Sequence, residues 1–333
     1  MYNCNLKIYK FANLIKKLNS IMNQFKKLNN IAGWVVFLIA SFVYFSTIEQ
    51  TVSFWDCGEY IATAYKLEVG HPPGAPLFQL FGRIFTLFAA QGTSEVAVSI
   101  NIMSALCSSF TILFLFWTIT AFGRKLFLNN ENEIELGKLI AVLGSGIVGA
   151  LAYTFSDSFW FSAVEGEVYA MSSLFTAVTF WCIMKWEEEA DKPHASRWLV
   201  LIGYLIGLSV GVHLLSLLTI PAMGMIYYFK KYEYTKAGAI KAFVSSMIIL
   251  GLVQGVIIPG AVSLISKFEL FFVNTIGLPF NSGTIIYFLA IIGAITFGLI
   301  YTKKHNKAVW NTAILGMMML LIGYSSFAIL VVR

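Results

Sequence analysis

The feature that most constrains this chain is a succession of apolar stretches, each about as long as a membrane crossing requires. A helix needs about 20 apolar residues to cross a hydrocarbon core about 30 Å thick. Charged residues make up only 12% of the sequence, against about 25% in soluble domains. The sequence therefore predicts an all-α polytopic membrane protein and excludes a soluble one. Clear spans are expected at residues 31–48, 97–122, 139–155, 168–186, 241–265, 283–302 and 309–332.

Two further apolar regions are ambiguous by length, and the distribution of basic residues decides how they run. Residues 73–90 are short, lie at a proline pair and carry Arg83, whereas residues 197–229 are too long for one crossing. Basic residues concentrate on the cytoplasmic side of membrane proteins. Most of the 23 basic residues fall on one side if 73–90 is a juxtamembrane helix and 197–229 splits near His213. We therefore expect about nine transmembrane helices, with juxtamembrane helices in a long first outer loop.

This topology places the N-terminus in the cytoplasm and divides the chain into two parts. Residues 1–30 form a basic cytoplasmic leader, of which 1–21 could be dispensable because Met22 would make a natural start. Residues 31–333 form the transmembrane domain. We expect this domain to belong to a longer protein, because it stops at Arg333 directly after an apolar run. The expected outer loops are 49–96, 157–167 and 266–282.

The basic residues indicate a lipid bilayer as partner and not a nucleic acid. They occur in short clusters between apolar spans, the pattern that records orientation in a membrane. The four cysteines form no CxxC pair, so neither a disulfide framework nor a zinc site is supported. The start rich in Lys, Asn and Ile and the short loops favour a bacterial inner membrane over the endoplasmic reticulum. The outer loops would then lie in the periplasm.

Two carboxylates open the first outer loop, whose sequence begins TVSFWDCGEYIATAYKLEVGHPPGAPLF. Asp56 and Glu59 are three residues apart, so they would share a face if this segment is helical. Apolar neighbours raise the pKa of a carboxylate and suit it to act as a general base. We predict Asp56 and Glu59 as catalytic residues. The simpler alternative is that these acids only mark the water interface.

His71 precedes two prolines, which fix the backbone and prevent a helix from forming before them. The prolines therefore hold His71 at a defined place near the membrane. A histidine can donate a hydrogen bond to a phosphate or transfer a proton, which makes His71 a candidate for substrate binding. The alternative is a rigid turn with an exposed histidine.

Further candidates for substrate binding lie in the second outer loop and near the expected span ends. Glu165 and Glu167 flank a glycine, and Tyr169 begins the next span. The acidic pair could bind a divalent cation, a sugar hydroxyl or an acceptor, or could simply be solvated. His213 could face a cavity or join helices. Arg83 could neutralise a lipid phosphate or extend to lipid headgroups. We assign no residue as a metal ligand.

Three segments carry a likeness to a known family, and they are FWDCGEYIATAYKLEVGHPPGAPLF at 54–78, FWFSAVEGEVYAM at 159–171 and GLSVGVHLLSLLTIPA at 207–222. They resemble the GT-C glycosyltransferases, and most closely the multi-pass family catalogued as domain of unknown function 2723, which is grouped with protein O-mannosyltransferases. The resemblance implies a polyprenyl- or dolichyl-phosphate sugar donor and transfer on the outer or lumenal face. It also implies that Asp56 matches the catalytic base and that His71 belongs to the donor or acceptor pocket.

These observations predict a hexosyltransferase that moves a sugar, mannose being one candidate, to a protein Ser/Thr or glycan hydroxyl. A lipid-linked donor keeps its reactive carbon at the membrane interface, where Asp56 is expected. We expect inversion, with Asp56 as general base and Glu59 or the acidic pair orienting the reactants. A transporter or flippase for a lipid-linked or small polar substrate remains an alternative, although the predicted spans lack Asp and Glu. A catalytically silent scaffold is a third reading.

Overall fold

The computed structural model describes residues 2–89, 93–128 and 136–327, and within this part all regular secondary structure is helical. This agrees with the fold class predicted from the apolar stretches. The elements are α1 (Tyr2–Ser46), α2 (Cys57–Lys66), α3 (Pro76–Thr86), α4 (Thr93–Phe127), α5 (Leu136–Thr154), α6 (Asp157–Val164), α7 (Val168–Glu189), α8 (Ser196–Val210), η1 (Leu214–Leu218), α9 (Thr219–Lys231), α10 (Lys236–Leu252), η2 (Val253–Ile257), α11 (Ile258–Leu270), η3 (Phe271–Thr275), α12 (Ser282–Lys304), α13 (Ala308–Tyr324) and η4 (Ser325–Phe327).

Within the described residues, seven helical segments are long and apolar enough to cross a membrane. α8, with 15 residues, is a shorter apolar helix, and α9 has 13 residues. Residues 211–213 interrupt the helix between them, so the predicted break near His213 is confirmed. The protein is therefore a multi-pass membrane protein, and the count of nine crossings stays a prediction.

The expected outer loops contain more helix than the sequence indicated. α3 has 11 residues, about 16 Å of helix, which is too short to cross a membrane and fits the predicted juxtamembrane helix. α6 occupies most of 157–167, and the helix that includes α11 continues through a π-helical turn to Thr275. The chain around Thr275 is apolar, and a backbone in apolar surroundings must satisfy its hydrogen bonds internally.

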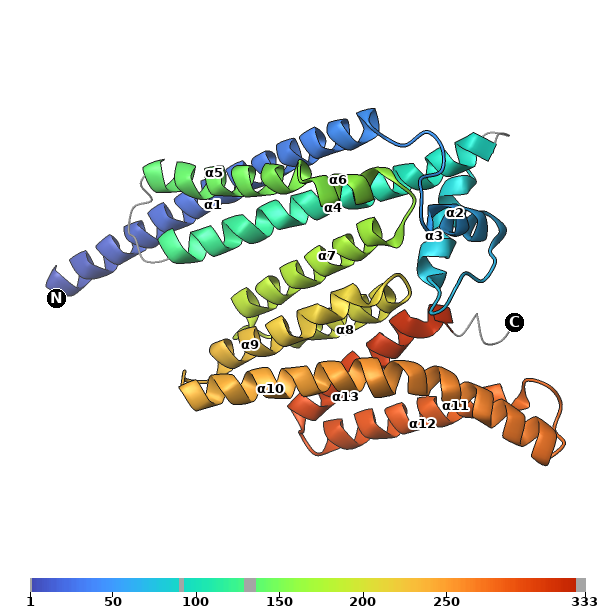
Figure 1. Ribbon diagram of the computed structural model, residues 1–333. Helices are drawn as coiled ribbons and strands as arrows, with labels where there is room; N and C mark the ends of the chain where they lie inside the picture. Colours follow the sequence, from blue (N-terminus) through green and yellow to red (C-terminus); the bar gives the residue numbers. More distant parts are fainter. Residues whose placement is uncertain (1, 90–92, 129–135, 328–333) are drawn as a thin grey trace.

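The long helices lie side by side, and α2 and α3 lie across one end of the bundle (Figure 1). We call this end, which also carries α6, the loop end. We call the opposite end, which carries Lys26, Arg124, Lys185 and Lys230, the basic end. Buried apolar side chains form separate clusters among α2, α3, α4 and α7, among α1, α4, α5 and α6, and around α8 and α13.

Glycines allow α8 and α13 to pack with their backbones in contact. A Cβ atom at Gly203 would lie 2.6 Å from the carbonyl oxygen of Gly316, and one at Gly207 would overlap the carbonyl of Leu320. Small residues four apart permit this close approach between membrane helices, where packing and not hydrophobicity drives association. The close contact fixes the position of the turn that follows α8.

Backbone contacts then attach the first loop to three parts of the bundle. The amide of Leu77 donates to the carbonyl of Gly211 at 2.8 Å, and the amide of Glu49 donates to the carbonyl of Val164 at 3.1 Å. The side-chain amide of Asn101 in α4 donates to the carbonyls of Glu49 and Thr51, at 2.7 and 3.2 Å. The loop is therefore held against α4, α6 and the turn after α8.

Candidate functional site

Asp56 stands at the N-cap of α2 at the loop end, with its carboxylate 59% exposed. It makes no side-chain capping bond to the helix, so its oxygens are free to face solvent or a ligand. The preceding residue, Trp55, has a φ of 64° and is 88% exposed. A bulky residue rarely adopts this left-handed conformation. The chain therefore reaches Asp56 through a strained turn that displays an aromatic ring beside the carboxylate.

Glu59 and His71 form the best-defined interaction of the first loop. One oxygen of Glu59 accepts from the backbone amide of His71, and the other lies 3.0 Å from His71 Nδ1. The backbone and ring hydrogen bonds from His71 lower the pKa of Glu59. The hydrogen bond from Glu59 raises the pKa of His71 above its ordinary 6.5. The pair therefore favours a carboxylate and an imidazolium.

The same imidazole also approaches Asp56. His71 Nε2 lies 3.9 Å from Asp56 Oδ2, which is too long for a hydrogen bond. The structure thus brings together the three first-loop candidates predicted from the sequence. Asp56 and Glu59 lie at the start of α2, and His71 lies at the proline turn. The Nε2–H group remains available to an acceptor between or beside the two side chains.

Glu165 and Glu167 occupy the break between α6 and α7, and both carboxylates are buried. Burial raises the pKa of Glu165, and burial together with the charge of Glu165 raises the pKa of Glu167. Glu167 is the N-cap of α7, where the helix dipole favours a negative charge. A Cβ atom at Gly166 would lie 3.0 Å from Asn101 Oδ1, so glycine lets the turn approach α4 closely.

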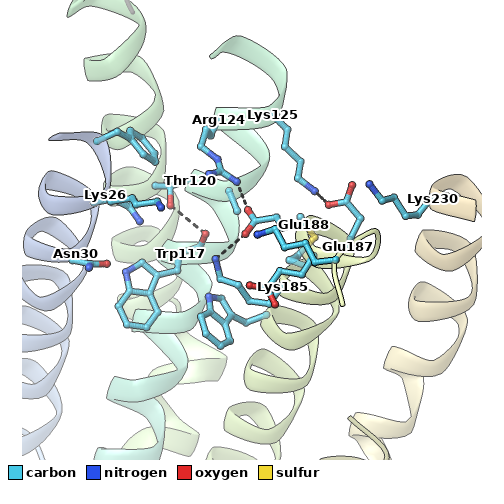
Figure 2. A pocket seen from close by; sticks show the side chains of 17 residues that line it. Lys26, Asn30, Trp117, Thr120, Arg124, Lys125, Lys185, Glu187, Glu188 and Lys230 are labelled. Carbon is cyan, nitrogen blue, oxygen red and sulfur yellow. Dashed lines mark hydrogen bonds and ion pairs between the residues drawn. The ribbon is translucent and has the colours of Figure 1, made fainter. Parts of the chain in front are cut away.

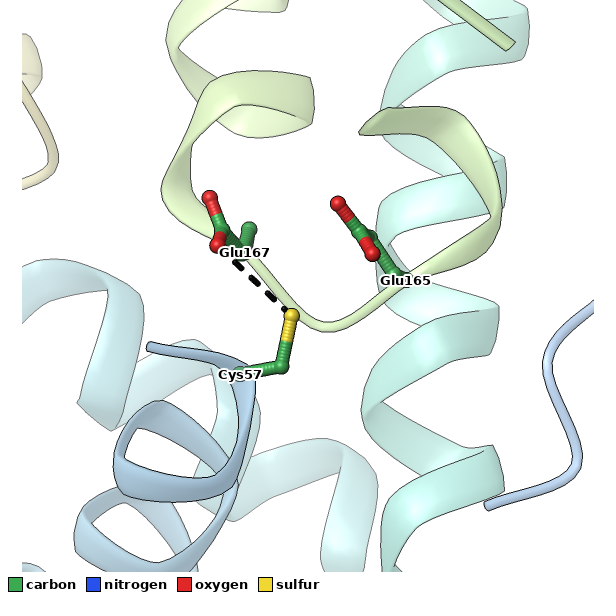
Figure 3. Close-up of side chains that lie close together, drawn as sticks. All are labelled: Cys57, Glu165 and Glu167. Atoms are coloured by element: carbon green, nitrogen blue, oxygen red, sulfur yellow. Dashed lines mark hydrogen bonds between the residues drawn. The ribbon is translucent and has the colours of Figure 1, made fainter. Parts of the chain in front are cut away.

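Cys57 joins this acidic turn to the start of α2 (Figure 3). Its Sγ atom is 3.7 Å from Glu167 Oε1, and one ligand atom from each of Cys57, Glu165 and Glu167 lies within 4.8 Å of the others. One thiolate and two carboxylates could bind a divalent cation. However, burial and the two glutamates raise the pKa of the thiol, so the geometry is that of a protonated thiol donating to Glu167.

Tyr60 connects the two groups of acids. Its ring lies 5.8 Å from that of His71, and burial followed by the charges of Asp56 and Glu167 raises its pKa to about 12. The proximity of Tyr169 also raises the pKa of Tyr60. The Tyr169 ring in turn lies 5.4 Å from that of His213. Tyr60 therefore stands at the centre of the site, between the first loop, the acidic turn and the turn after α8.

His213 keeps its place by capping η1, since its Nδ1 atom accepts from the amide of Leu215 at 3.2 Å. Burial lowers the pKa of His213, so its neutral form is favoured. Arg83 does not join the cluster. Its guanidinium lies 5.2 Å from the centre of the Tyr65 ring and donates to Thr86 at 3.3 Å.

Cys57, Tyr60 and Asn101 belong to the site although the sequence alone did not indicate a role for them. The buried Asn101 was the most accessible clue, because a polar side chain inside an otherwise apolar span is costly without a partner. Its Oδ1 atom has no hydrogen-bond partner among the described residues and faces Gly166. Cys57 and Tyr60 differ, because only the fold brings them to the acidic turn.

A cavity of about 800 Å³ opens next to the first loop. Its polar lining residues are Gln50, Thr51, Glu95 and Ser99, and Phe85, Phe88, Val98 and Ile102 contribute apolar walls. The carbonyl of Thr51 accepts from the side-chain amide of Asn101. A cavity with both apolar and polar walls thus lies beside the segment that leads to Asp56.

The fold and site define a multi-pass membrane protein with a carboxylate-rich cluster at one end of its helix bundle. The family model of the protein O-mannosyl-transferase TMEM260 N-terminal domain matches residues 56–236. The match covers more than half of the chain, and the chain belongs to this family. It begins at Asp56 and includes every residue of the candidate site.

Two relatives are each similar to more than half of the chain. The protein O-mannosyl-transferase tmem260 of Dictyostelium discoideum is 29% identical over 197 residues, which cover 56% of this chain and 22% of the relative. The protein O-mannosyl-transferase TMEM260 of Mus musculus is 26% identical over 176 residues, 53% of this chain and 22% of the relative. The chain thus matches less than a quarter of either relative. No solved structure matches it significantly.

Proposed function

We propose that this protein is a GT-C-type glycosyltransferase that moves a hexose, with mannose as first candidate, from a polyprenyl-phosphate donor to a protein hydroxyl. The carrying observation is the exposed Asp56 carboxylate beside the Glu59–His71 pair, at the end of the bundle. The family supports mannosyl transfer to protein, because both relatives are named protein O-mannosyl-transferases. The segments at 54–78, 159–171 and 207–222, which resemble the family catalogued as domain of unknown function 2723, support the GT-C type.

The proposed step is a single displacement with inversion. The Ser or Thr hydroxyl oxygen attacks the anomeric carbon of the sugar, and Asp56 accepts the hydroxyl proton. The bond between the anomeric carbon and the phosphate oxygen breaks, and its electron pair leaves with polyprenyl phosphate. Asp56 suits this role because its oxygens make no hydrogen bond to the helix that it begins.

His71 would stabilise the leaving phosphate. Its interaction with Glu59 favours the imidazolium, and its Nε2–H group is not in hydrogen-bonding distance of Asp56. A positive donor placed where negative charge develops lowers the barrier to reaction. Glu59 is then a positioning residue, because it acts through the charge and orientation of His71.

The second group of acids would bind the sugar. A protonated glutamic acid can donate and accept hydrogen bonds with hydroxyl groups, and burial favours protonation of Glu165 and Glu167. The cavity beside Thr51 could take the first units of the prenyl chain against its apolar walls. We place the site in the periplasm of a bacterial inner membrane, as the positive-inside distribution predicts.

The test compares Asp56→Asn with Glu68→Gln in membranes that contain the full chain. Glu68 is a matched control, because it lies in the same loop and its side chain is 58% exposed, against 59% for Asp56. Transfer of labelled mannose from polyprenyl-phosphate mannose to a Ser/Thr peptide should fall about 100- to 10,000-fold in Asp56→Asn. Glu68→Gln should keep the parent rate. Equal rates in the two variants, or no transfer by the parent, would exclude the proposal.

A further inference from the structure

A second cavity lies at the basic end, among α1, α4, α7 and α9, and it has a volume of about 710 Å³ (Figure 2). This volume lies within the range typical of small-molecule sites. Three acidic residues line it, Glu187, Glu188 and Glu189. Six cationic residues line it as well, and they are Lys26, Arg124, Lys125, Lys185, Lys192 and Lys230. The lining therefore carries an excess of positive charge.

Ion pairs neutralise part of this charge. Arg124 and Lys185 both contact Glu188, and Lys125 contacts Glu187. The pairs of Arg124 and Lys125 connect α4 to α7, and the pair of Lys185 with Glu188 lies within α7. Lys230 forms an ion pair at 2.9 Å with Asp191, an acid that does not line the cavity. The positive charge that remains is carried by Lys26 of α1 and by Lys192, which follows α7.

Lys26 on α1 and Lys192, which follows α7, line the cavity without an ion pair among the described residues, and Lys26 is the one on α1. It projects from α1 toward the paired residues of α4 and α7 (Figure 2). It is exposed, and it makes no hydrogen bond or ion pair with another described residue. Nearby, the lining residues Asn29 and Trp117 each have a buried polar atom, Oδ1 and Nε1, without a hydrogen-bond partner in the described part of the chain. Buried polar atoms without partners are unfavourable.

We propose that this cavity binds a phosphate-bearing anion, supplied by the headgroup of an anionic phospholipid or by a soluble phosphate compound. Lysine and arginine side chains at the end of a helix bundle attract phosphate groups, and basic pockets between membrane helices bind anionic lipid headgroups.

The surroundings of the cavity suit a lipid. Trp34 of α1 packs edge to face against Trp117, with ring centroids 6.4 Å apart, and it remains 46% exposed. An exposed tryptophan at this position is typical of a membrane interface. A lipid headgroup in the cavity could therefore leave its acyl chains against the apolar surface of α1.

Adjacent lysines provide a matched pair of variants. Lys26 lines the cavity, whereas Lys27, its exposed neighbour on the same helix, does not. We would purify the parent, Lys26→Gln and Lys27→Gln in detergent and titrate each with phosphatidylglycerol, with phosphatidylcholine and with inorganic phosphate, measuring bound ligand by native mass spectrometry. Loss of one lysine–phosphate contact should weaken binding of the anionic ligand about fivefold in Lys26→Gln. Lys27→Gln should bind as the parent does.

The two sources of phosphate give different results. Binding of phosphatidylglycerol that depends on Lys26 and resists competition by inorganic phosphate identifies a lipid headgroup. Binding of inorganic phosphate with the same dependence on Lys26 identifies a soluble ligand. Equal weakening in the two lysine variants, or equal retention of phosphatidylcholine by the parent, would overturn the proposal. The result is independent of sugar transfer, because this cavity lies at the opposite end from Asp56.

Discussion

The two ends of the helix bundle treat their carboxylates in opposite ways. At the basic end, Glu187 and Glu188 contact lysine or arginine side chains across two helices, and Glu189 contacts Arg197 at 3.0 Å. At the loop end, Glu165 and Glu167 are buried, and no Lys or Arg forms an ion pair with either among the described residues. The glutamates of the basic end are thus paired with cations, whereas Glu165 and Glu167 at the loop end lie near other acids.

This difference separates carboxylates that hold the fold from carboxylates available to a ligand. An acid paired with a cation at a helix junction stabilises the packing of the two helices. A buried acid without a cation opposes folding unless it becomes protonated or binds another group. The loop end therefore holds buried acids that no described Lys or Arg pairs with, at the place where we propose that sugar is transferred.

Among the substitutions that test this difference between the two ends, we expect the largest effect from Glu167→Gln. We expect it to lower sugar transfer about tenfold to a hundredfold, because the acid that orients the sugar is lost. Burial raises the pKa of Glu167, so its charged form destabilises the fold as the pH rises through that pKa. The glutamine variant should remove this decline and unfold at the parent's temperature or above it. A thermal unfolding series against pH, with transfer rates at each pH, checks both results.

Glu188→Gln should give the opposite result at the basic end. The substitution weakens the contact to Arg124, which connects α7 to α4, and the contact to Lys185 within α7. We expect a loss of roughly 1–2 kcal/mol in the free energy of unfolding, with sugar transfer within about twofold of the parent. Thermal unfolding in detergent and the peptide assay measure the two quantities. Normal stability with impaired transfer would contradict the division between the two ends.

A smaller effect should follow from the pH dependence of the Glu59–His71 pair. The pKa of His71 is raised and that of Glu59 is lowered, so their interaction is complete between the ordinary values of about 4.5 and 6.5. It is lost as the pH rises through the raised pKa of His71. We therefore expect binding of polyprenyl phosphate to weaken severalfold above that pKa.

The matching variant is Glu59→Gln, which removes the carboxylate that raises the pKa of His71. The midpoint of the binding curve should move to lower pH, and His71→Gln should abolish the pH dependence. His305 serves as a control, because it is exposed and contacts only the carbonyl of Tyr301 and its ring among the described residues. A midpoint that responds to His305→Gln and not to Glu59→Gln would assign the titration elsewhere.

Much of the fold could be predicted because the relevant signals are local. Apolar runs locate the long helices, the excessive length of 197–229 requires a break, and the proline turn separates α2 from α3. The helical continuation to Thr275 was not predicted, because the polar boundary of a span does not require its helix to end.

The candidate site was predictable only in part. Asp56, Glu59 and His71 lie within 16 positions of one another, and the structure brings them together. The burial of Glu165 and Glu167 depends on α4 and α2, which are distant in sequence. Arg83 lies against the Tyr65 ring, a contact that the sequence did not indicate, and its role in substrate binding stays a prediction. Pairing and burial are tertiary properties that residue type does not determine.

The position of Cys57 makes movement of the first loop measurable with a native atom. Its thiol is fully buried between the start of α2 and the acidic turn, so an alkylating reagent can reach it only when these two parts separate. In a protein whose other cysteines are replaced by alanine, the alkylation rate of Cys57 would report how often that separation occurs. Slower labelling in the presence of a donor lipid would indicate that the bound substrate holds the start of α2 against the acidic turn.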